Sequence, residues 1–163
     1  VGLYALKDNR LSLLDYKQVN NTYVMQKWYD TFDTTYPTIV GNDFVHLRYA
    51  DVVLMYAETL ALMDGGDMSL ACEYLNKTRK RAGLDDFSTS DRKEFIQELA
   101  DERGREFLDE GQRWFDLVRL GLAVEYFTSL GYSMDSHNLI MPIPKSQLEI
   151  YGDTSVLWQN PGF

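Results

Sequence analysis

A charged residue inside an apolar helical pattern constrains this chain more than any other feature. Between residues 95 and 107, apolar side chains recur at helical spacing and share one face with Arg103. A guanidinium stays protonated in proteins, so a buried arginine requires carboxylate partners. Glu102, Glu106 and Glu110 lie within one or two helical turns of Arg103. The stretch therefore predicts charge held inside a core.

A second stretch, residues 44–63, is apolar nearly all round, which is typical of a buried helix. Its charged residues Arg48, Asp51 and Glu58 fall along one side. Such a stripe needs partners, and the charged residues of 102–119 offer them. We predict a buried structural ion network that joins the two stretches. Its expected members are Arg48, Asp51, Glu58, Arg103, Glu106, Glu110, Arg113, Asp116 and Arg119.

Helical spacing also predicts a helix over residues 70–82, a third that runs to Glu110, and a fourth over 113–120 whose pattern continues to residue 130. Asp67 or Ser69 is expected to cap the helix over 70–82, and Gly83 with Leu84 to end it in a left-handed cap. Gly121 is expected to stop or bend the fourth helix.

The sequence predicts a single, mostly α domain over residues 1–163. Helix pairs joined by short turns suggest tetratricopeptide-like packing for 44–131, although the repeat spacing is longer than in that class. Residues 1–43 are expected to be irregular or extended. Three prolines in 132–163 predict an extended tail without regular helix, wrapped over the helical scaffold.

Composition excludes several classes of function. The net charge of −9 argues against nucleic acid and against an anionic membrane surface as partners. Cys72 is the single cysteine, so no internal disulfide forms. Sequence patterns for metal ligands, phosphate loops and catalytic nucleophiles are absent, so we predict no metal, no cofactor and no enzymatic activity. Glu106 and Glu110 are one turn apart, which leaves a carboxylate-dependent glycoside hydrolase as the least favoured alternative.

Four stretches, in order, resemble the SusD/RagB family of cell-surface nutrient-binding lipoproteins of Bacteroidetes. They are Arg48 to Glu58, Tyr74 to Gly83, Glu102 to Arg119, and the ending from Met141-Pro-Ile-Pro144 through Gln159-Asn-Pro-Gly-Phe163. Asp8-Asn9-Arg10-Leu11 is similar to a turn that often precedes this region in the family, with Asn9 in place of proline. The resemblance covers the family's C-terminal part, so the chain is expected to be a fragment.

The resemblance implies a fold built on tetratricopeptide-like repeats and a non-catalytic subunit that captures a glycan or another nutrient. It also implies an outer-membrane location at the cell surface, a lipid anchor outside this chain, and a TonB-dependent transporter of the SusC type as partner. A tetratricopeptide-like protein-interaction scaffold without sugar binding is the alternative from another class.

The family's glycan contacts differ between members, so no ligand residue is carried over from it. Aromatic faces stack on sugars, and one polar, aromatic loop supplies them. Ordinary packing of its tryptophan and tyrosine is the competing interpretation. The predicted ligand-binding residues are Trp28, Tyr29 and Tyr36.

Overall fold

The computed structural model describes residues 3–14, 17–19, 22–24, 27, 43 and 45–163. The chain forms two compact units, Val1–Arg113 and Trp114–Phe163, which are treated separately below. The single domain over 1–163, with its divisions at 43/44 and 131/132, stays a prediction. Within the described residues, no helix has the length and apolar character needed to cross a membrane.

Unit 1 begins with a short 3-10 helix, η1 (Asn9–Leu14), and a small antiparallel hairpin of β1 (Lys17–Val19) and β2 (Thr22–Val24). Lys17 pairs with Val24 and Val19 with Thr22. The hairpin agrees with the expectation of extended structure in the N-terminal segment.

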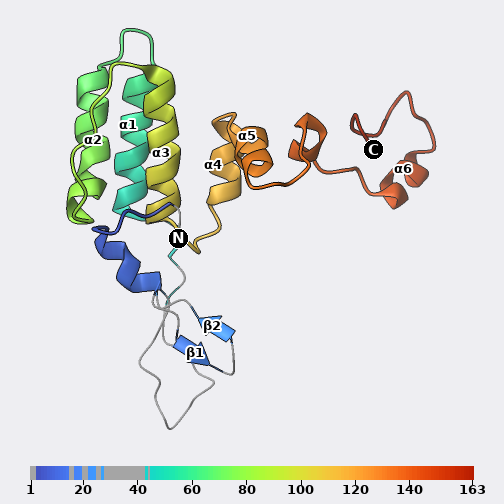
Figure 1. The fold of residues 1–163 in the computed structure, drawn as a ribbon. Helices are drawn as coiled ribbons and strands as arrows, with labels where there is room; N and C mark the ends of the chain where they lie inside the picture. Colours follow the sequence, from blue (N-terminus) through green and yellow to red (C-terminus); the bar gives the residue numbers. More distant parts are fainter. Residues whose placement is uncertain (1–2, 15–16, 20–21, 25–26, 28–42, 44) are drawn as a thin grey trace. The chain divides into compact units, whose positions relative to one another are not determined.

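Three helices, α1 (Tyr49–Leu62), α2 (Met68–Arg81) and α3 (Arg92–Glu106), pack side by side and form the core of unit 1 (Figure 1). α1 and α2 form an antiparallel pair joined by a short turn. Residues 82–91 then return along α2, so α3 runs in the direction of α2. The start of α1 and the ends of α2 and α3 therefore meet at one end of the bundle. The mostly α class and the pairing of helices are confirmed.

Fully buried side chains from each helix fill the space between them. The largest are Leu54 of α1, Leu75 of α2, and Phe95 and Leu99 of α3. Asn76 on α2 anchors the returning segment, because its side-chain amide donates to the Phe87 carbonyl and accepts from the Phe87 N–H, at 2.9 and 2.8 Å. Burial of this apolar set supplies the main driving force for folding of the unit.

The predicted caps of α2 are present. The Asp67 carboxylate accepts from the Leu70 N–H at 2.9 Å, which places the N-cap at Asp67 rather than Ser69. Gly83 has a φ of 77°, and Gly83 and Leu84 donate to the carbonyls of Lys80 and Arg79. This is a Schellman cap, in which the left-handed residue satisfies the last carbonyls of the helix.

Two predicted helix ends are wrong. The first helix begins at Tyr49 instead of residue 44, with Arg48 as an extended N-cap, and the third ends at Glu106 instead of Glu110. Asp109 and Gly111 have φ of 63° and 76°, which an α-helix cannot accommodate. α1 is also less buried than its composition predicts, because Tyr49, Val52, Met55, Tyr56, Leu62 and Met63 are exposed.

Unit 2 follows a helical pattern interrupted by glycine. α4 (Arg113–Arg119) leads into it, and α5 (Ala123–Ser129) follows after Gly121, whose φ of 73° ends α4 as expected. Phe127 of α5 packs against the rings of Trp114, Tyr126 and Tyr132, with centroid distances of 5.7, 5.3 and 6.1 Å. Aromatic packing therefore replaces a large aliphatic core here.

The prediction of a tail without regular helix is wrong. A 3-10 helix, η2 (Ser136–Leu139), and a helix, α6 (Lys145–Tyr151), lie within residues 132–163. Pro144 is the N-cap of α6, and Pro142 precedes it. A proline outside the helix interior removes no intrahelical hydrogen bond, so these prolines set the start of α6 instead of preventing it.

Side-chain amides hold the tail to itself. The Gln159 amide accepts from the Ile143 N–H and donates to the Ile143 carbonyl, at 2.7 and 3.0 Å. Asn160 donates to the Met141 carbonyl at 2.6 Å. The Gln159 amide thus satisfies both backbone groups of Ile143, as a paired strand would. Ile143 lies between two prolines, which have no N–H to donate.

Candidate functional site

The predicted ligand-binding residues Trp28, Tyr29 and Tyr36 lie outside the described residues, so their role stays a prediction. The described chemistry gathers instead at the end of the bundle where α1 begins and α2 and α3 end. We call this part of unit 1 the charged end. Its charged side chains are Asp8, Arg10, Lys27, Arg48, Arg79, Arg81, Glu98, Glu102, Arg105, Glu106 and Glu110.

Next to the charged end, Arg103 lies in the apolar interior and meets a carboxylate from α1. Its Nη1 donates to Asp51 Oδ1 at 2.7 Å, and its Nη2 donates to Gln112 Oε1 at 2.9 Å. Both partners of the ion pair are buried. The guanidinium also lies 4.9 Å from the centre of the Phe107 ring. The structure thus brings together Asp51 of α1 and Arg103 of α3, two predicted members of the network.

Arg48 stands before α1 and reaches the end of α3. It donates to Glu106 Oε1 at 2.8 Å and to the two carboxylate oxygens of Glu110 at 2.7 and 3.0 Å. Arg48 is the extended N-cap of α1, so its side chain can reach Glu106 and Glu110 at the end of α3. Glu110 follows α3, so the pair connects two chain segments that leave the bundle at the same end.

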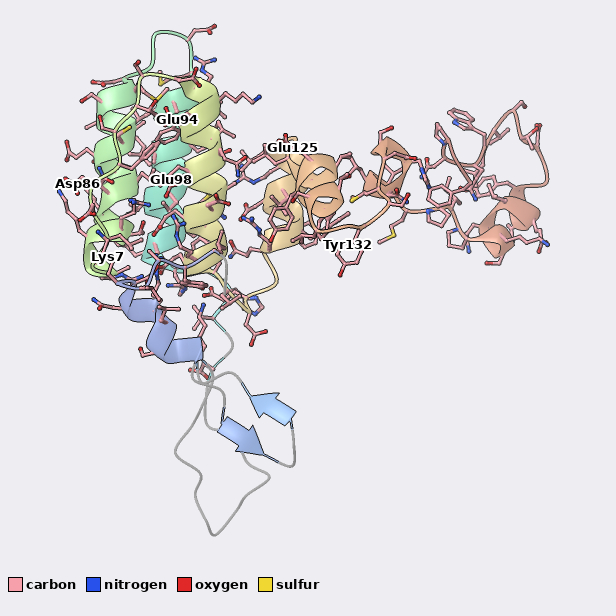
Figure 2. The ribbon with its side chains drawn as sticks, in the orientation of Figure 1. Lys7, Asp86, Glu94, Glu98, Glu125 and Tyr132 are labelled. Atoms are coloured by element: carbon pink, nitrogen blue, oxygen red, sulfur yellow. The ribbon has the colours of Figure 1, made fainter. Side chains whose placement is uncertain are left out.

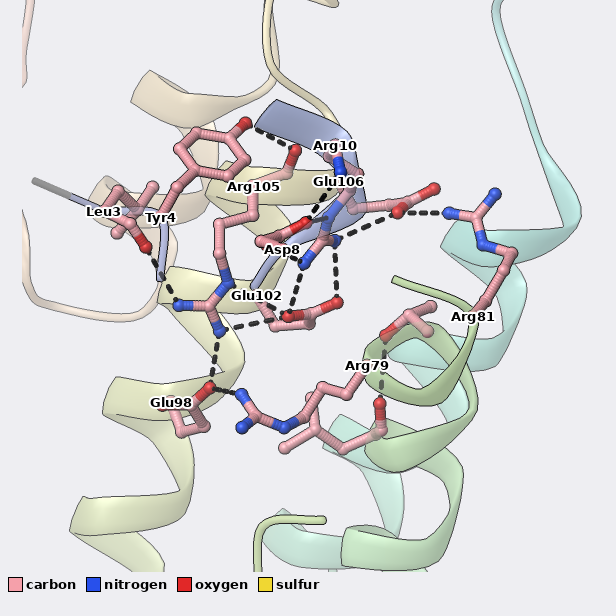
Figure 3. Close-up of polar contacts among 12 residues, drawn as sticks. Leu3, Tyr4, Asp8, Arg10, Arg79, Arg81, Glu98, Glu102, Arg105 and Glu106 are labelled. Carbon is pink, nitrogen blue, oxygen red and sulfur yellow. Dashed lines mark hydrogen bonds and ion pairs between the residues drawn. The ribbon is translucent and has the colours of Figure 1, made fainter. Parts of the chain in front are cut away.

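Sequence reasoning missed Arg10, which is central to the charged end (Figure 3). It donates to both oxygens of Asp8 at 2.9 and 2.8 Å, to both oxygens of Glu102 at 2.9 and 3.3 Å, and to Glu106 at 3.2 Å. Glu102 is 0% exposed. The signal was the Asp-x-Arg pattern at residues 8–10, which the sequence analysis interpreted only as a turn.

A second chain of contacts runs along α3 from the same carboxylate. Arg105 donates to Glu102 Oε2 at 3.1 Å and also meets Glu98, which is shared with Arg79 of α2. Figure 2 shows Glu98 on α3, one turn from the exposed Glu94. The polar contacts of the charged end therefore cross from the N-terminal segment through α3 to α2.

Burial and ion pairing have opposite effects on the pKa values of these carboxyl groups. Burial by itself raises the pKa of Glu106, but the hydrogen bond from Arg48 and the charge of Arg81 outweigh it and hold this pKa below its usual range. Burial likewise raises the pKa of Asp8, but the hydrogen bonds from Arg10 outweigh it, so this pKa is also lowered. Both carboxylates are therefore ionised at neutral pH.

Cations and a phenol also satisfy the last carbonyls of α3, which have no partner within the helix. The Tyr4 hydroxyl donates to the Arg105 carbonyl at 2.8 Å, and burial raises the pKa of Tyr4 to about 12. Lys27 Nζ and Arg48 Nη2 donate to the Glu106 carbonyl at 3.1 and 2.9 Å. Positive charge at a helix C-terminus is favourable, so these contacts stabilise the end of α3.

The other four predicted members of the network are Glu58, Arg113, Asp116 and Arg119. Arg113 donates to the Ala100 carbonyl, and its guanidinium covers Gly104, where a Cβ would lie 2.7 Å from Arg113 Nη1. Asp116 and Arg119 form an ion pair at 2.9 Å within α4 in unit 2. Glu58 is half-buried on α1. A shared network that includes these four residues stays a prediction.

A pocket of about 260 Å³ opens at the charged end. Its wall includes Arg10, Arg48, Arg81 and Glu106. Glu106 faces Arg10, Arg48 and Arg81 and its pKa is lowered, and a carboxylate that stays ionised is a poor proton donor for glycoside hydrolysis. Across the described parts of the chain, no group of three or more His, Cys, Asp or Glu is placed to hold a metal ion.

These features define a helical scaffold whose helix ends are joined by buried ion pairs. The sequence profile of the SusD family matches residues 4–140 of this chain. The chain belongs to the SusD family. The match includes the core helices, the charged end and Arg10, so the residues that sequence reasoning missed also lie within the family region.

Curated relatives and solved structures agree with this assignment. SusD-like protein P2 of Formosa agariphila is 28% identical over 136 residues, which is 76% of this chain and 26% of that protein. SusD-like protein P38 of the same organism is 35% identical over 98 residues, or 55% of this chain and 19% of that protein. This chain therefore spans about a quarter or less of the length of these relatives.

Among solved structures, a SusD-like protein from Bacteroides fragilis is 25% identical with a TM-score of 0.65, and the match covers 85% of this chain and 30% of that one. A SusD superfamily protein from Bacteroides vulgatus is 31% identical with a TM-score of 0.53, covering 63% of this chain and 24% of that one. Both likenesses support the helical fold described above.

Proposed function

We propose that this chain is part of a nutrient-binding subunit of an outer-membrane uptake system, which captures an oligosaccharide or another nutrient and hands it over unchanged. The observation that carries the proposal is the family match over residues 4–140. The charged end agrees with it, because its buried carboxylates are held in ion pairs with arginines.

The partner in this proposal is a TonB-dependent transporter of the SusC type. The location is the cell surface at the outer membrane, with a lipid anchor outside this chain. Family membership supports both. The helical bundle acts as a rigid scaffold, and the nutrient contacts are assigned to the aromatic loop with Trp28, Tyr29 and Tyr36.

A tetratricopeptide-like interaction scaffold without sugar binding is the second candidate. One observation favours it: α1 exposes a continuous apolar stripe that includes Tyr49, Val52 and Tyr56, at spacings of three and four residues. Exposed apolar patches often mark protein contacts. The same stripe would serve a nutrient-binding protein that docks on a partner, so sugar binding decides between the two.

Tryptophan fluorescence tests the proposal. The chain and a longer form with its natural upstream sequence are titrated with neutral oligosaccharides of several linkages. We expect saturable quenching that Trp28→Ala removes. Trp158→Ala is the matched control, because Trp158 lies exposed in the tail of unit 2. Release of shorter sugars from the same mixture would instead indicate a hydrolase, and absence of binding by either form would leave the interaction scaffold.

A further inference from the structure

The side chains that line the pocket at the charged end are mostly cationic, although the chain as a whole is acidic. Five cationic side chains line it, namely Arg10, Lys27, Arg48, Arg81 and Arg105, against one carboxylate, Glu106, among the described residues. The chain as a whole carries −9. A cavity lined mainly by one sign of charge concentrates ligands of the opposite sign.

Most of these cations are already saturated. Arg10 directs all its guanidinium nitrogens to Asp8, Glu102 and Glu106. Lys27 donates to two carbonyls and to Glu110. These side chains contribute field to the pocket, but their hydrogen-bond donors are not available to a ligand.

Arg81 is different. Its Nη2 meets Glu106, and its side chain is 61% exposed. Among the contacts of the described residues, its Nε and Nη1 have no acceptor, and Arg81 lines the pocket. Figure 3 shows Arg81 approaching Glu106 from the end of α2. Each pair of guanidinium donors that can bind one carboxylate includes Nη2, so Arg81 binds a second carboxylate through two hydrogen bonds only when it turns away from Glu106.

Glu106 has other partners besides Arg81. Its oxygens also accept from Arg48 at 2.8 Å and from Arg10 at 3.2 Å. If Arg81 turned to a second carboxylate, Glu106 would remain ion-paired and no buried charge would be exposed without a partner.

The volume limits what enters. About 260 Å³ is below the range of roughly 300–1,000 Å³ that holds drug-sized ligands, so the pocket accepts one small ring at most. Asn9 and Ser12 lie on the wall beside Arg81, and their amide and hydroxyl groups suit the hydroxyls of a sugar.

We propose that this pocket binds one acidic sugar residue, with Arg81 holding its carboxylate. The choice of a sugar rests on the proposed nutrient-binding function, whereas the choice of a carboxylate rests on the cations of the pocket. The pocket assignment rests on Arg81 and the other assignment on Trp28, so different variants test the two.

Isothermal titration of the chain with glucuronate tests the proposal, with glucose as the uncharged probe of the same ring. We expect saturable binding of glucuronate that weakens as salt rises, and no saturation with glucose. Arg81→Gln should weaken glucuronate binding roughly ten-fold or more, because a charged hydrogen-bond donor is lost. Lys80→Gln is the matched control, because exposed Lys80 pairs with Asp86 outside the pocket. Circular dichroism verifies that both variants fold.

Equal affinity of glucuronate for the chain and for Arg81→Gln would overturn the proposal, as would equal binding of glucose or no binding of glucuronate at millimolar concentration. If neutral oligosaccharides still quench tryptophan fluorescence in that case, only the pocket assignment fails. If neither acidic nor neutral sugars bind the chain or its longer form, the proposed function fails with it.

Discussion

At the charged end of unit 1, Arg10 holds the carboxylates of Asp8 and Glu102 in a buried setting, whereas in the tail of unit 2 the neutral amide of Gln159 holds the backbone of Ile143. The contact between Arg10 and Glu102 joins residues 92 apart in sequence, whereas Gln159 and Ile143 are 16 apart. Removing one partner of a buried ion pair is strongly destabilising, because the other charge stays buried without a partner. Removing a neutral amide costs less free energy, because no charge is left buried.

The largest effect is expected from Glu102→Gln. The substitution keeps the shape of the side chain but removes the charge that Arg10 and Arg105 both face in the interior. Loss of one partner of a buried ion pair typically reduces the free energy of unfolding by about 3–5 kcal/mol. Urea denaturation of the chain measures it.

The neighbouring substitution Asp101→Asn is the control for Glu102→Gln. Asp101 is half-exposed and meets Arg113 at 3.5 Å, so its loss should change stability by about 1 kcal/mol or less. If the two variants had equal stability, the buried carboxylate would not be a major support of unit 1.

The next largest effect on stability is expected from acid, which should act differently on the two regions. The pKa values of Asp8 and Glu106 are lowered in the folded state, so their stabilising contribution is complete above their unfolded values, about 3.9 and 4.3, and is lost as the pH falls through the folded values. We expect the free energy of unfolding to be level from pH 6 to 8 and to fall below about pH 5.

Hydrogen exchange locates that loss. Amide protection factors in α3 should decrease as the pH falls from about 5 to 2, whereas those of Ile143 should not follow, because the Gln159 amide does not titrate. Parallel loss of protection in both regions would show that carboxylate protonation at the charged end is not what acid disrupts.

A smaller effect is expected from Gln159→Glu. The carboxylate keeps an acceptor for the Ile143 N–H but loses the donor to the Ile143 carbonyl. One neutral hydrogen bond contributes about 0.5–1.5 kcal/mol, so the local opening free energy at Ile143 should fall by that amount. Exposed Gln147 on α6 gives the matched control Gln147→Glu, which should leave protection at Ile143 unchanged.

The smallest effect is expected from Lys145→Ala. Lys145 and Glu149 form an exposed pair at 3.7 Å on α6. Exposed pairs at this spacing contribute about 0.3–0.5 kcal/mol, so urea denaturation should detect little or no change. A loss above about 1 kcal/mol would mean that exposed charge matters as much as the buried kind in this molecule.

The part of the fold that follows from local periodicity could be predicted. The apolar spacing of residues 95–107 predicts α3 and the inward position of Arg103, and Gly83 predicts the end of α2. The N-terminal partner of Glu102 could not be predicted, because Arg10 lies 92 residues away and no helical pattern links the two. A carboxylate on a helix shows that a cation is needed, but not which segment provides it.

Helix ends were predicted less well for a related reason. Arg48 continues the apolar pattern of α1 in sequence, yet it leaves the helix because its guanidinium reaches Glu106 and Glu110. In the tail, Pro144 is a helix breaker only inside a helix, and here it precedes the first turn of α6. Tertiary contacts and the position of a single proline decided these boundaries.

The central claim is that arginines among apolar side chains brace the bundle and do not themselves bind cargo. The free energy of unfolding of Arg103→Met, compared with Arg92→Met on the exposed face of the same helix, tests it most directly. We predict a loss of about 3–5 kcal/mol for Arg103→Met and about 0.5 kcal/mol or less for Arg92→Met, with sugar binding per folded molecule unchanged in both. Normal stability of Arg103→Met together with lost sugar binding would contradict the account.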